Sequence, residues 1–230
     1  MTSKLKRSLI ERSLEQAMEV FDRHNIRLPP FAYWTVDDWL RKGHEVDEIR
    51  DCMLGWDVTD FGLGDFARFG RTLFTLRNGS PGGQYPKPYA EKLLLNPEGQ
   101  RAPAHFHRSK MEDITNRAGG VIVVRVWAPD ERGQKSASPL RIQVDGETVP
   151  LEAGGLVRLQ PGQSVSLPPG TIHQFWAEEG TGITVSSEVS SVNDDRRDNY
   201  FLTSVSRFPA IEEDEPLRYY LCHEYPPAAR

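Results

Sequence analysis

The sequence predicts a mainly β protein in which a helical N-terminal extension precedes a small antiparallel barrel or sandwich. Apolar side chains recur at helical spacing over roughly the first 65 residues. Short β-rich stretches then follow about every ten residues, with Gly, Pro and Asp turns between them. The chain of 230 residues is 38% hydrophobic and 27% charged, which is sufficient for the core of one large domain.

The N-terminal extension is expected to contain three helices. Its first apolar stripe, with spacings of three to five, consists of Leu5, Leu9, Leu14, Met18 and Phe21. Pro29 and Pro30 end this helix, Thr35 offers an N-cap for a second one, and "EVDEIRDCMLG" predicts a third. The turn-rich stretch 76–90 marks a boundary. We therefore expect residues 1–88 to form an extension and a connection that pack on the barrel.

The barrel itself is expected to occupy residues 89–206. Its β-rich stretches are 91–99, 121–129, 140–151, 155–162, 164–170, 172–180 and 182–192. Asp145-Gly146 is a typical hairpin turn within one of them. The tail, 207–230, is first acidic and then apolar, and we expect it to complete the barrel.

Charge and cysteine content limit the partners and the compartment. A net charge of −5 argues against a nucleic-acid-binding protein. The two cysteines, Cys52 and Cys222, lie outside any CxxC motif, which favours a reducing compartment. The N-terminus does not read as a signal peptide, and no apolar run approaches the roughly 20 residues of a membrane span. We expect a cytoplasmic protein with a small-molecule partner and no membrane association.

The stretch "APAHFHRSKMEDITNRAGG" (102–120) concentrates metal-binding side chains. In a strand, His105 and His107 point to the same face, and Glu112 could return its carboxylate to them after a short loop. Two imidazoles and a carboxylate suit Mn, Fe, Co, Ni or Zn. An HxH pair alone is common on surface strands, so a further ligand is needed. His173, which follows the turn Pro168–Gly170, is a candidate, although a lone histidine among apolar neighbours is usually a hydrogen-bonded core residue.

Together the two segments resemble the paired motifs of the cupin superfamily. Gly99 to Gly119 reads G-x5-H-x-H-x4-E-x6-G, and Gly162 to His173 reads G-x5-P-x-G-x2-H. The resemblance implies a cupin-type antiparallel β-barrel (jelly-roll). It also implies one divalent metal per chain, whose ligands would be His105, His107, Glu112 and His173.

A narrower resemblance is to the D-lyxose isomerase family. It rests on "HFH", "KMEDI" and "GG" in the first motif, on "GWDVTDFG" upstream, and on "SSEVSSVNDD" and "RFPAIEEDE" downstream. Ala118 departs from the run of three glycines that the family would show. The resemblance implies interconversion of D-lyxose and D-xylulose, often also of D-mannose and D-fructose. It further implies a divalent metal, commonly Mn(II), and a homodimer.

Such an isomerisation moves a proton between C1 and C2 through a cis-enediol, and a divalent ion with open positions would stabilise the negative oxygens. We expect Lys110 to handle the proton, because burial and a nearby cation would lower its pKa and make the neutral amine accessible. The resemblance places a C-terminal carboxylate opposite this lysine, with Glu212 favoured and Glu213 the alternative.

Three further residues are candidates for substrate contact. Glu188 would line the pocket if it faces inward with Ser186 and Ser190, and would be a surface residue if Val185 and Val189 face inward instead. Asp113 could orient a histidine ligand. Trp56 could stack on a sugar or simply pack between extension and barrel.

Other chemistries remain open at this point. An Fe(II)-dependent cupin oxygenase would use similar ligands but would require O2. A non-catalytic sugar-binding cupin would bind a sugar without converting it. A phosphorylated substrate would need a basic cradle, and Lys92, Arg101 and Arg108 form no recognisable one.

Overall fold

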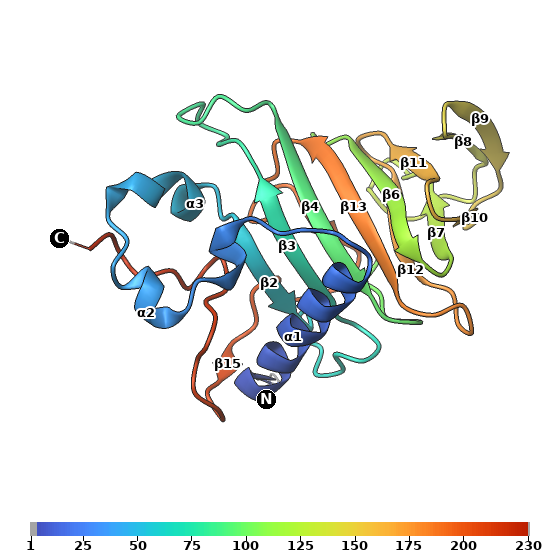
Figure 1. Cartoon of the computed structure of the whole chain (residues 1–230). Helices are drawn as coiled ribbons and strands as arrows, with labels where there is room; N and C mark the ends of the chain where they lie inside the picture. Colours follow the sequence, from blue (N-terminus) through green and yellow to red (C-terminus); the bar gives the residue numbers. More distant parts are fainter. Residues whose placement is uncertain (1–3, 230) are drawn as a thin grey trace.

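The computed structural model describes residues 4–229, and two antiparallel sheets dominate the structure (Figure 1). The larger sheet has eight strands in the order β2-β3-β4-β13-β6-β11-β8-β9. The smaller sheet has five strands in the order β10-β7-β12-β5-β14, while β1 and β15 form a separate parallel pair. The prediction of a mainly β protein with an N-terminal helix is confirmed.

The element bounds are as follows. The helices are α1 (Arg7–Arg23), the 3-10 turn Pro30–Tyr33, α2 (Val36–Trp39), the 3-10 turn His44–Val46 and α3 (Asp47–Asp51). The strands are β1 (Leu5–Lys6), β2 (Gly55–Thr59), β3 (Arg71–Arg77), β4 (Tyr89–Asn96), β5 (His105–Phe106), β6 (Glu112–Gly119), β7 (Ile122–Trp127), β8 (Leu140–Val144), β9 (Glu147–Leu151), β10 (Leu156–Leu159), β11 (Ser164–Leu167), β12 (Ile172–Ala177), β13 (Thr184–Ser191), β14 (Tyr200–Phe201) and β15 (Ile211–Glu212).

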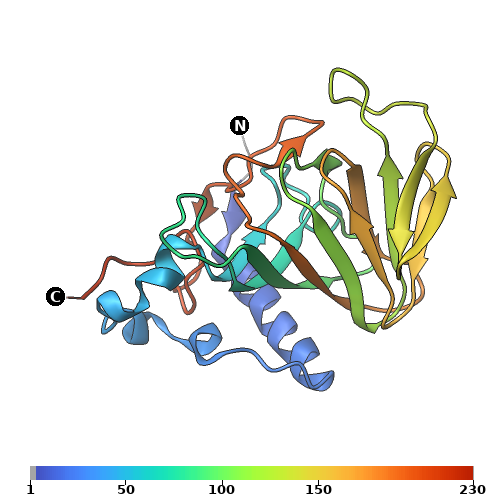
Figure 2. The same ribbon diagram turned by 90° about the horizontal axis from the view of Figure 1, so that it is seen from above.

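Helix α1 lies against the outer face of the large sheet (Figure 2). Its buried side chains include Ile10, Leu14 and Phe21, which pack on residues of β2, β3 and β4. Of the predicted stripe, Leu5, Leu14 and Phe21 are buried, whereas Leu9 and Met18 are only partly buried. None of the described helices is long and apolar enough to cross a membrane.

The short helices begin where the sequence predicts. The Thr35 side chain accepts from the Asp38 N–H at 3.3 Å, and the Asp38 carboxylate accepts from the Thr35 N–H at 3.0 Å. This reciprocal capping box determines the start of α2.

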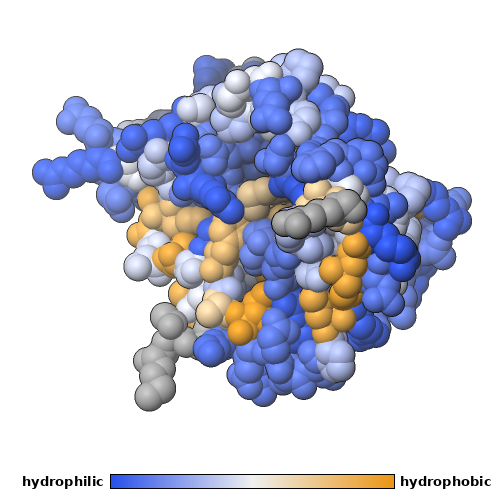
Figure 3. Space-filling view, turned by 90° about the vertical axis from the view of Figure 1, so that its left-hand side faces the viewer, coloured by the Kyte–Doolittle hydropathy of each residue, from blue (hydrophilic) through white to orange (hydrophobic). Residues whose placement is uncertain are grey.

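Apolar patches interrupt a mainly hydrophilic surface on the side of the molecule that carries α2 and α3 (Figure 3).

A second apolar core fills the space between the two sheets. Both sheets contribute to it: the larger one with Leu73, Leu94, Ile114, Ile142, Val165 and Leu167, the smaller one with Ile122, Val124, Val126, Val157, Leu159 and Phe175. Inward-facing apolar residues from opposed antiparallel sheets are what holds a closed β sandwich or barrel together. The same interior, beyond these residues, contains the polar pocket described below.

The extension is not separate from the sheet, which differs from the expected boundary near residue 88. Strands β2 and β3 both belong to the eight-stranded sheet, and β3 pairs with β4 across that boundary. Strand β2 was not predicted from the sequence because all five of its residues are buried. Since one face is covered by α1 and the other faces the interior, the strand shows no apolar–polar alternation.

The C-terminal segment lies along the free edge of the large sheet. Residues 206–225 hydrogen-bond to the β2 region through Ser206, Cys222 and Tyr225, and the Cys222 N–H donates to the Trp56 carbonyl at 2.7 Å. This segment adds no strand to either large sheet; its one short strand, β15, pairs with β1. The tail thus covers an exposed edge rather than completing the barrel.

Candidate metal centre and polar pocket

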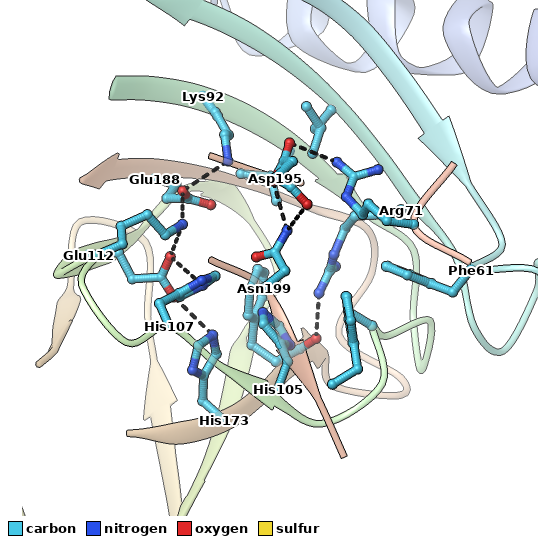
Figure 4. A pocket seen from close by; sticks show the side chains of 17 residues that line it. Phe61, Arg71, Lys92, His105, His107, Glu112, His173, Glu188, Asp195 and Asn199 are labelled. Atoms are coloured by element: carbon cyan, nitrogen blue, oxygen red, sulfur yellow. Dashed lines mark hydrogen bonds and ion pairs between the residues drawn. The ribbon is translucent and has the colours of Figure 1, made fainter. Parts of the chain in front are cut away.

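A polar pocket lies between the two sheets (Figure 4). Its lining includes three histidines, three carboxylates and four cationic side chains: His105, His107, His173, Glu112, Glu188, Asp195, Lys92, Lys110, Arg71 and Arg207. Phe61, Phe175, Phe201 and a few smaller residues complete the wall. So many charged groups in one buried cavity indicate a functional site.

Three histidines form a compact group at one end of the pocket. His105 on β5 is paired directly with His173 on β12, and His107 follows β5. One ligand atom from each lies within 4.8 Å of the others, a spacing that could hold a metal ion. Adjacent strands of the smaller sheet thus bring together residues that are distant in the sequence.

Backbone carbonyls determine which nitrogen of each ring faces the centre. His105 Nδ1 donates to Pro103 O at 2.9 Å, His107 Nδ1 to Asp198 O at 2.7 Å, and His173 Nδ1 to Thr171 O at 3.0 Å. With the proton on Nδ1, each Nε2 carries a lone pair. Such orientation by a hydrogen bond to the second nitrogen is usual for metal-binding histidines.

Glu112 lies beside two of these lone pairs. Its Oε1 is 2.8 Å from His173 Nε2, and its Oε2 is 3.5 Å from His107 Nε2. Oε1 and His173 Nε2 are both buried and have no hydrogen-bond partner within the described part of the chain. A cation between these acceptors would satisfy all of them, so the residues present fit a divalent metal with N and O ligands.

Burial and mutual repulsion control the charges of this group. Burial, reinforced by His173 and His107, lowers the pKa of His105 well below its usual value, so the ring is neutral. Burial would raise the pKa of Glu112, but Lys110 and the neighbouring histidines hold it well below its usual range. A neutral imidazole and an ionised carboxylate are the forms that bind metals.

Lys110 bridges two carboxylates inside the pocket. Its Nζ lies 2.6 Å from Glu112 Oε2 and 2.7 Å from Glu188 Oε1. Burial alone would lower the pKa of Lys110, but these two carboxylates outweigh burial and raise it. These contacts favour the ammonium form of Lys110, which is opposite in direction to the lowered pKa expected from the sequence.

Glu188 faces the pocket, the first of the two orientations considered from the sequence. Glu188 is 7% exposed, whereas its neighbour Val189 is 46% exposed. Strand β13 pairs with β4 in unbroken register, so side-chain alternation places Val185 under α1 and Glu188 on the opposite, inward face. Lys92 also donates to Glu188 Oε1, at 3.1 Å, and the two lysines hold the pKa of Glu188 below its usual value against the effect of burial.

The opposite end of the pocket consists of residues that were not singled out from the sequence. Arg207 pairs with Asp195 at 3.1 Å and also with Asp57 on β2. Asn199 donates to Asp195 at 2.9 Å. Arg71 is fully buried and lies 4.1 Å from the centre of the Phe175 ring. Asp195 and Asn199 belong to a loop, and no periodic pattern would have distinguished them from solvent-exposed turn residues.

Trp56 is a packing residue rather than a sugar contact. It is 2% exposed, stacks near Phe21, meets Phe74 edge-on and donates its indole N–H to Ala32 O at 2.8 Å. Because side chains alternate along β2, Trp56 faces α1 while Asp57 faces the interior.

Asp113 lies on the outer face of the barrel. Strand β6 pairs with β11 and β13, and its alternation sends Glu112 inward and Asp113 outward. Asp113 lines a surface hollow with Met111 and Val189 and contacts none of the three histidines in the structure. The expected role of orienting a histidine belongs instead to the backbone carbonyls of Pro103, Asp198 and Thr171.

The expected C-terminal carboxylates lie outside the pocket of this chain. Glu212 is exposed on β15, and Glu213 makes a bidentate ion pair with the buried Arg7 of α1, at 2.8 Å for both bonds. Since β15 pairs with β1, this acidic run is anchored to the N-terminal region. Within the chain, Glu188 is the carboxylate that lies opposite Lys110.

Comparisons with known proteins show the family of this chain. A sequence model described as D-lyxose isomerase matches residues 5–225. The D-lyxose/D-mannose isomerase of Serratia proteamaculans is 47% identical over 96% of this chain and 98% of that relative, and the one from Escherichia coli O157:H7 is 46% identical over the same shares.

Solved structures give the fold. The L-ribose isomerase of Cellulomonas parahominis superposes with a TM-score of 0.59 at 17% identity, over 92% of this chain and all of that one. The L-ribose isomerase of Acinetobacter sp. DL28 superposes with a TM-score of 0.60 at 16% identity, over 91% and 98% of the two chains. The likeness covers more than nine-tenths of this chain in both comparisons.

Proposed function

Because this chain belongs to the D-lyxose isomerase family, and is thereby an aldose–ketose isomerase, we propose that it interconverts D-lyxose with D-xylulose and D-mannose with D-fructose in a metal-dependent reaction. One observation carries the proposal: the buried His105–His107–His173 group and the Lys110–Glu188 pair share one pocket. An aldose–ketose isomerase needs both an electrophile for the sugar oxygens and a group that moves a proton between neighbouring carbons.

The metal site would consist of His105, His107, His173 and Glu112. When bound, a divalent ion supplies positive charge to the oxygens on C1 and C2. We propose Mn(II), because nitrogen and carboxylate ligands with room for further oxygens suit its preference for high coordination numbers; Co, Zn, Fe or Ni would fit the same donors.

Glu188 is the residue that we propose as the proton carrier. Both lysines bind its Oε1, so Oε2 is the oxygen left to take a proton from one carbon and return it to the next. The same carboxylate can serve both carbons, because they are bonded to each other and one small movement of the base spans them.

Lys110 positions Glu188 relative to the oxygens of the sugar. It uses two of its three N–H donors on Glu112 and Glu188, which leaves one for an oxygen that becomes negative in the enediol. Asp195, Asn199 and Arg207, at the other end of the pocket, would bind the hydroxyl groups farther along the sugar. The aromatic rings of Phe61 and Phe201 would exclude water.

The decisive experiment is incubation with D-lyxose, D-mannose or D-xylulose and Mn(II) in deuterated water. The ketose or aldose product should form and carry deuterium at C1 or C2, at equal rates in air and under argon. A requirement for O2 and Fe(II) would favour an oxygenase, and sugar binding without conversion would favour a binding protein. No turnover with any of the five metals would refute the proposal.

We also propose that the protein acts as a homodimer in the cytoplasm, as the family resemblance implies. Light scattering on the purified protein tests the first point: a mass near twice 26.1 kDa supports it, and a mass equal to one chain contradicts it. Fractionation of cells that express the full chain tests the second.

A further inference from the structure

A tight turn near the C-terminus brings two potential metal ligands to the edge of the large sheet. The turn runs from Leu221 to Glu224 and is closed by the Glu224 N–H, which donates to the Leu221 carbonyl at 2.8 Å. Cys222 and His223 occupy its centre. The Cys222 N–H donates to Trp56 O, which places the turn beside the next residue of β2, Asp57. One donor atom from each of Asp57, Cys222 and His223 lies within 4.8 Å of the other two.

These donors are buried and unsatisfied. Asp57 is 2% exposed and Cys222 is 6% exposed. Asp57 Oδ1 and His223 Nδ1 are buried atoms without a hydrogen-bond partner among the described residues. A buried polar atom without a hydrogen-bond partner lowers the stability of the fold. Two such atoms in one cluster therefore indicate a bound group that interacts with both. Donors of a tetrahedral zinc site lie about 3.3–3.8 Å apart, because Zn–S is near 2.3 Å and Zn–N near 2.0 Å.

The charge balance of the surroundings favours a cation. Arg207 donates to Asp57 Oδ2, which leaves Oδ1 free, and it also donates to Asp195 at 3.1 Å. Within the directly paired group of Asp57, Asp195 and Arg207, two carboxylates share one guanidinium and carry one net negative charge, while Lys92 and Lys110 act on Asp195 only through space. A divalent ion that displaces the thiol proton of Cys222 into solvent adds one net positive charge and neutralises the group.

We propose that Asp57, Cys222 and His223 form a second metal site, separate from the histidine pocket, for a divalent ion of borderline softness such as Zn(II). Thiolate, imidazole and carboxylate are the usual ligands of zinc in proteins. A water molecule would take the fourth position from the cavity that His223 lines together with Arg207 and Phe208. The ion would tie the C-terminal turn to β2 beside Arg207. This inference goes beyond the isomerase function and does not depend on it.

Cobalt(II) distinguishes the two sites, because only this one contains a cysteine. The full-length protein is freed of metal by a chelator and titrated with Co(II) alone, while absorbance and bound metal are recorded. The wild type should bind two ions per chain and show a thiolate-to-cobalt charge-transfer band in the near ultraviolet. Zn(II) added afterwards should remove the band.

Variants locate the ligands. Cys222→Ser should lose the band and one bound ion, whereas Cys52→Ser, the matched control at the other buried cysteine, should keep both. His107→Ala, which removes a ligand of the pocket, should keep the band. His223→Gln changes a half-buried side chain and should weaken Co(II) binding at this site at least about tenfold, which provides a second test if Cys222→Ser does not fold. Absence of the band in the wild type, its survival in Cys222→Ser, or unchanged affinity in His223→Gln would each overturn the proposal.

Discussion

Nε2 of His173 lies 2.8 Å from Oε1 of Glu112, although the histidine proton is on the opposite nitrogen, where it is donated to Thr171 O. In the tautomer that a metal requires, two lone pairs therefore face each other in a buried site, and neither atom has another partner among the described residues. Such an arrangement is unfavourable without a cation, so the metal should stabilise the fold as well as the reaction.

Metal removal is the first test of this relationship. Chelation should abolish isomerisation and lower the midpoint of thermal unfolding, and Mn(II) should restore both. A ligand present at about 1,000 times its Kd adds roughly 4 kcal/mol to the free energy of unfolding. His107→Ala should show no activity and should lose most of the Mn(II)-dependent rise in the midpoint. Full activity in a preparation shown by elemental analysis to be metal-free would contradict the assignment.

Glu188→Gln should separate chemistry from metal binding. The amide keeps the shape of the side chain but cannot accept the proton, so kcat should fall by about 10²- to 10⁴-fold while metal content stays the same. Glu91→Gln is the matched control, since Glu91 lies on the neighbouring strand β4 in an exposed ion pair with Arg77. Elemental analysis and sugar turnover are measured side by side. A normal rate in Glu188→Gln would remove this residue from the mechanism.

Substitutions at Lys110 test whether its charge or its basicity matters. Lys110→Met leaves Glu112 and Glu188 without their shared cation, and removing one partner of a buried ion pair costs roughly 3–5 kcal/mol. Lys110→Arg keeps the charge, so it should be clearly more stable than Lys110→Met and retain part of the rate. If a neutral amine were the base, both variants would be equally inactive.

Glu213→Gln tests the corrected position of the acidic C-terminal run. Glu213 pairs with Arg7 but its side chain is 56% exposed, so the variant should lose less than about 1 kcal/mol of stability. Its kcat should stay within twofold of the wild type, because the carboxylate lies outside the pocket. Urea denaturation and initial rates measure the two effects. A large loss of rate at unchanged stability would show that this carboxylate reaches a sugar site after all.

Asp195 should make the stability of the pocket dependent on acidity. Burial would raise the pKa of Asp195, but Arg207, Lys92 and Lys110 together hold it far below its usual value. A carboxylate with a lowered folded-state pKa contributes stability above its unfolded pKa of about 3.9, and this contribution is lost as pH falls below that value. Asp195→Asn should therefore flatten the acid side of a plot of unfolding free energy against pH. An identical slope between pH 5 and pH 3 would contradict this.

Local spacing predicted eight of the strands and placed His105, His107 and His173 where their rings meet in the pocket, whereas their role as metal ligands was implied by the cupin resemblance. His105 and His107 are two residues apart and must share a face of an extended chain, and the turn Pro168–Gly170 places His173 at the start of its strand. Both inferences depend only on local backbone geometry. Helix α2 was predictable for the same reason, since the Thr35 cap and its Asp38 partner lie three residues apart.

Strand β2 and the Glu188–Lys110 pair could not be derived in that way. β2 is buried on both faces, so its sequence carries no alternation. The alternation of β13 leaves two possible orientations for Glu188, and only the packing of Val185 against α1 selects between them. The carboxylates chosen from the C-terminal run, Glu212 and Glu213, lie outside the pocket because β15 pairs with β1 at the N-terminal end of α1.

The sequence by itself thus determined the class of fold, the helical extension and the four residues that meet at one end of the pocket. Tertiary structure alone decided what surrounds them: which carboxylate faces Lys110, that Arg207 joins Asp57 to Asp195, and that Asp57 meets Cys222 and His223. The physical reason is the distance along the sequence between the residues that interact. Ligand spacing and turns are local properties of the backbone, whereas the charge of Lys110 and the partners of Arg207 depend on strands and loops that meet only after the chain has folded.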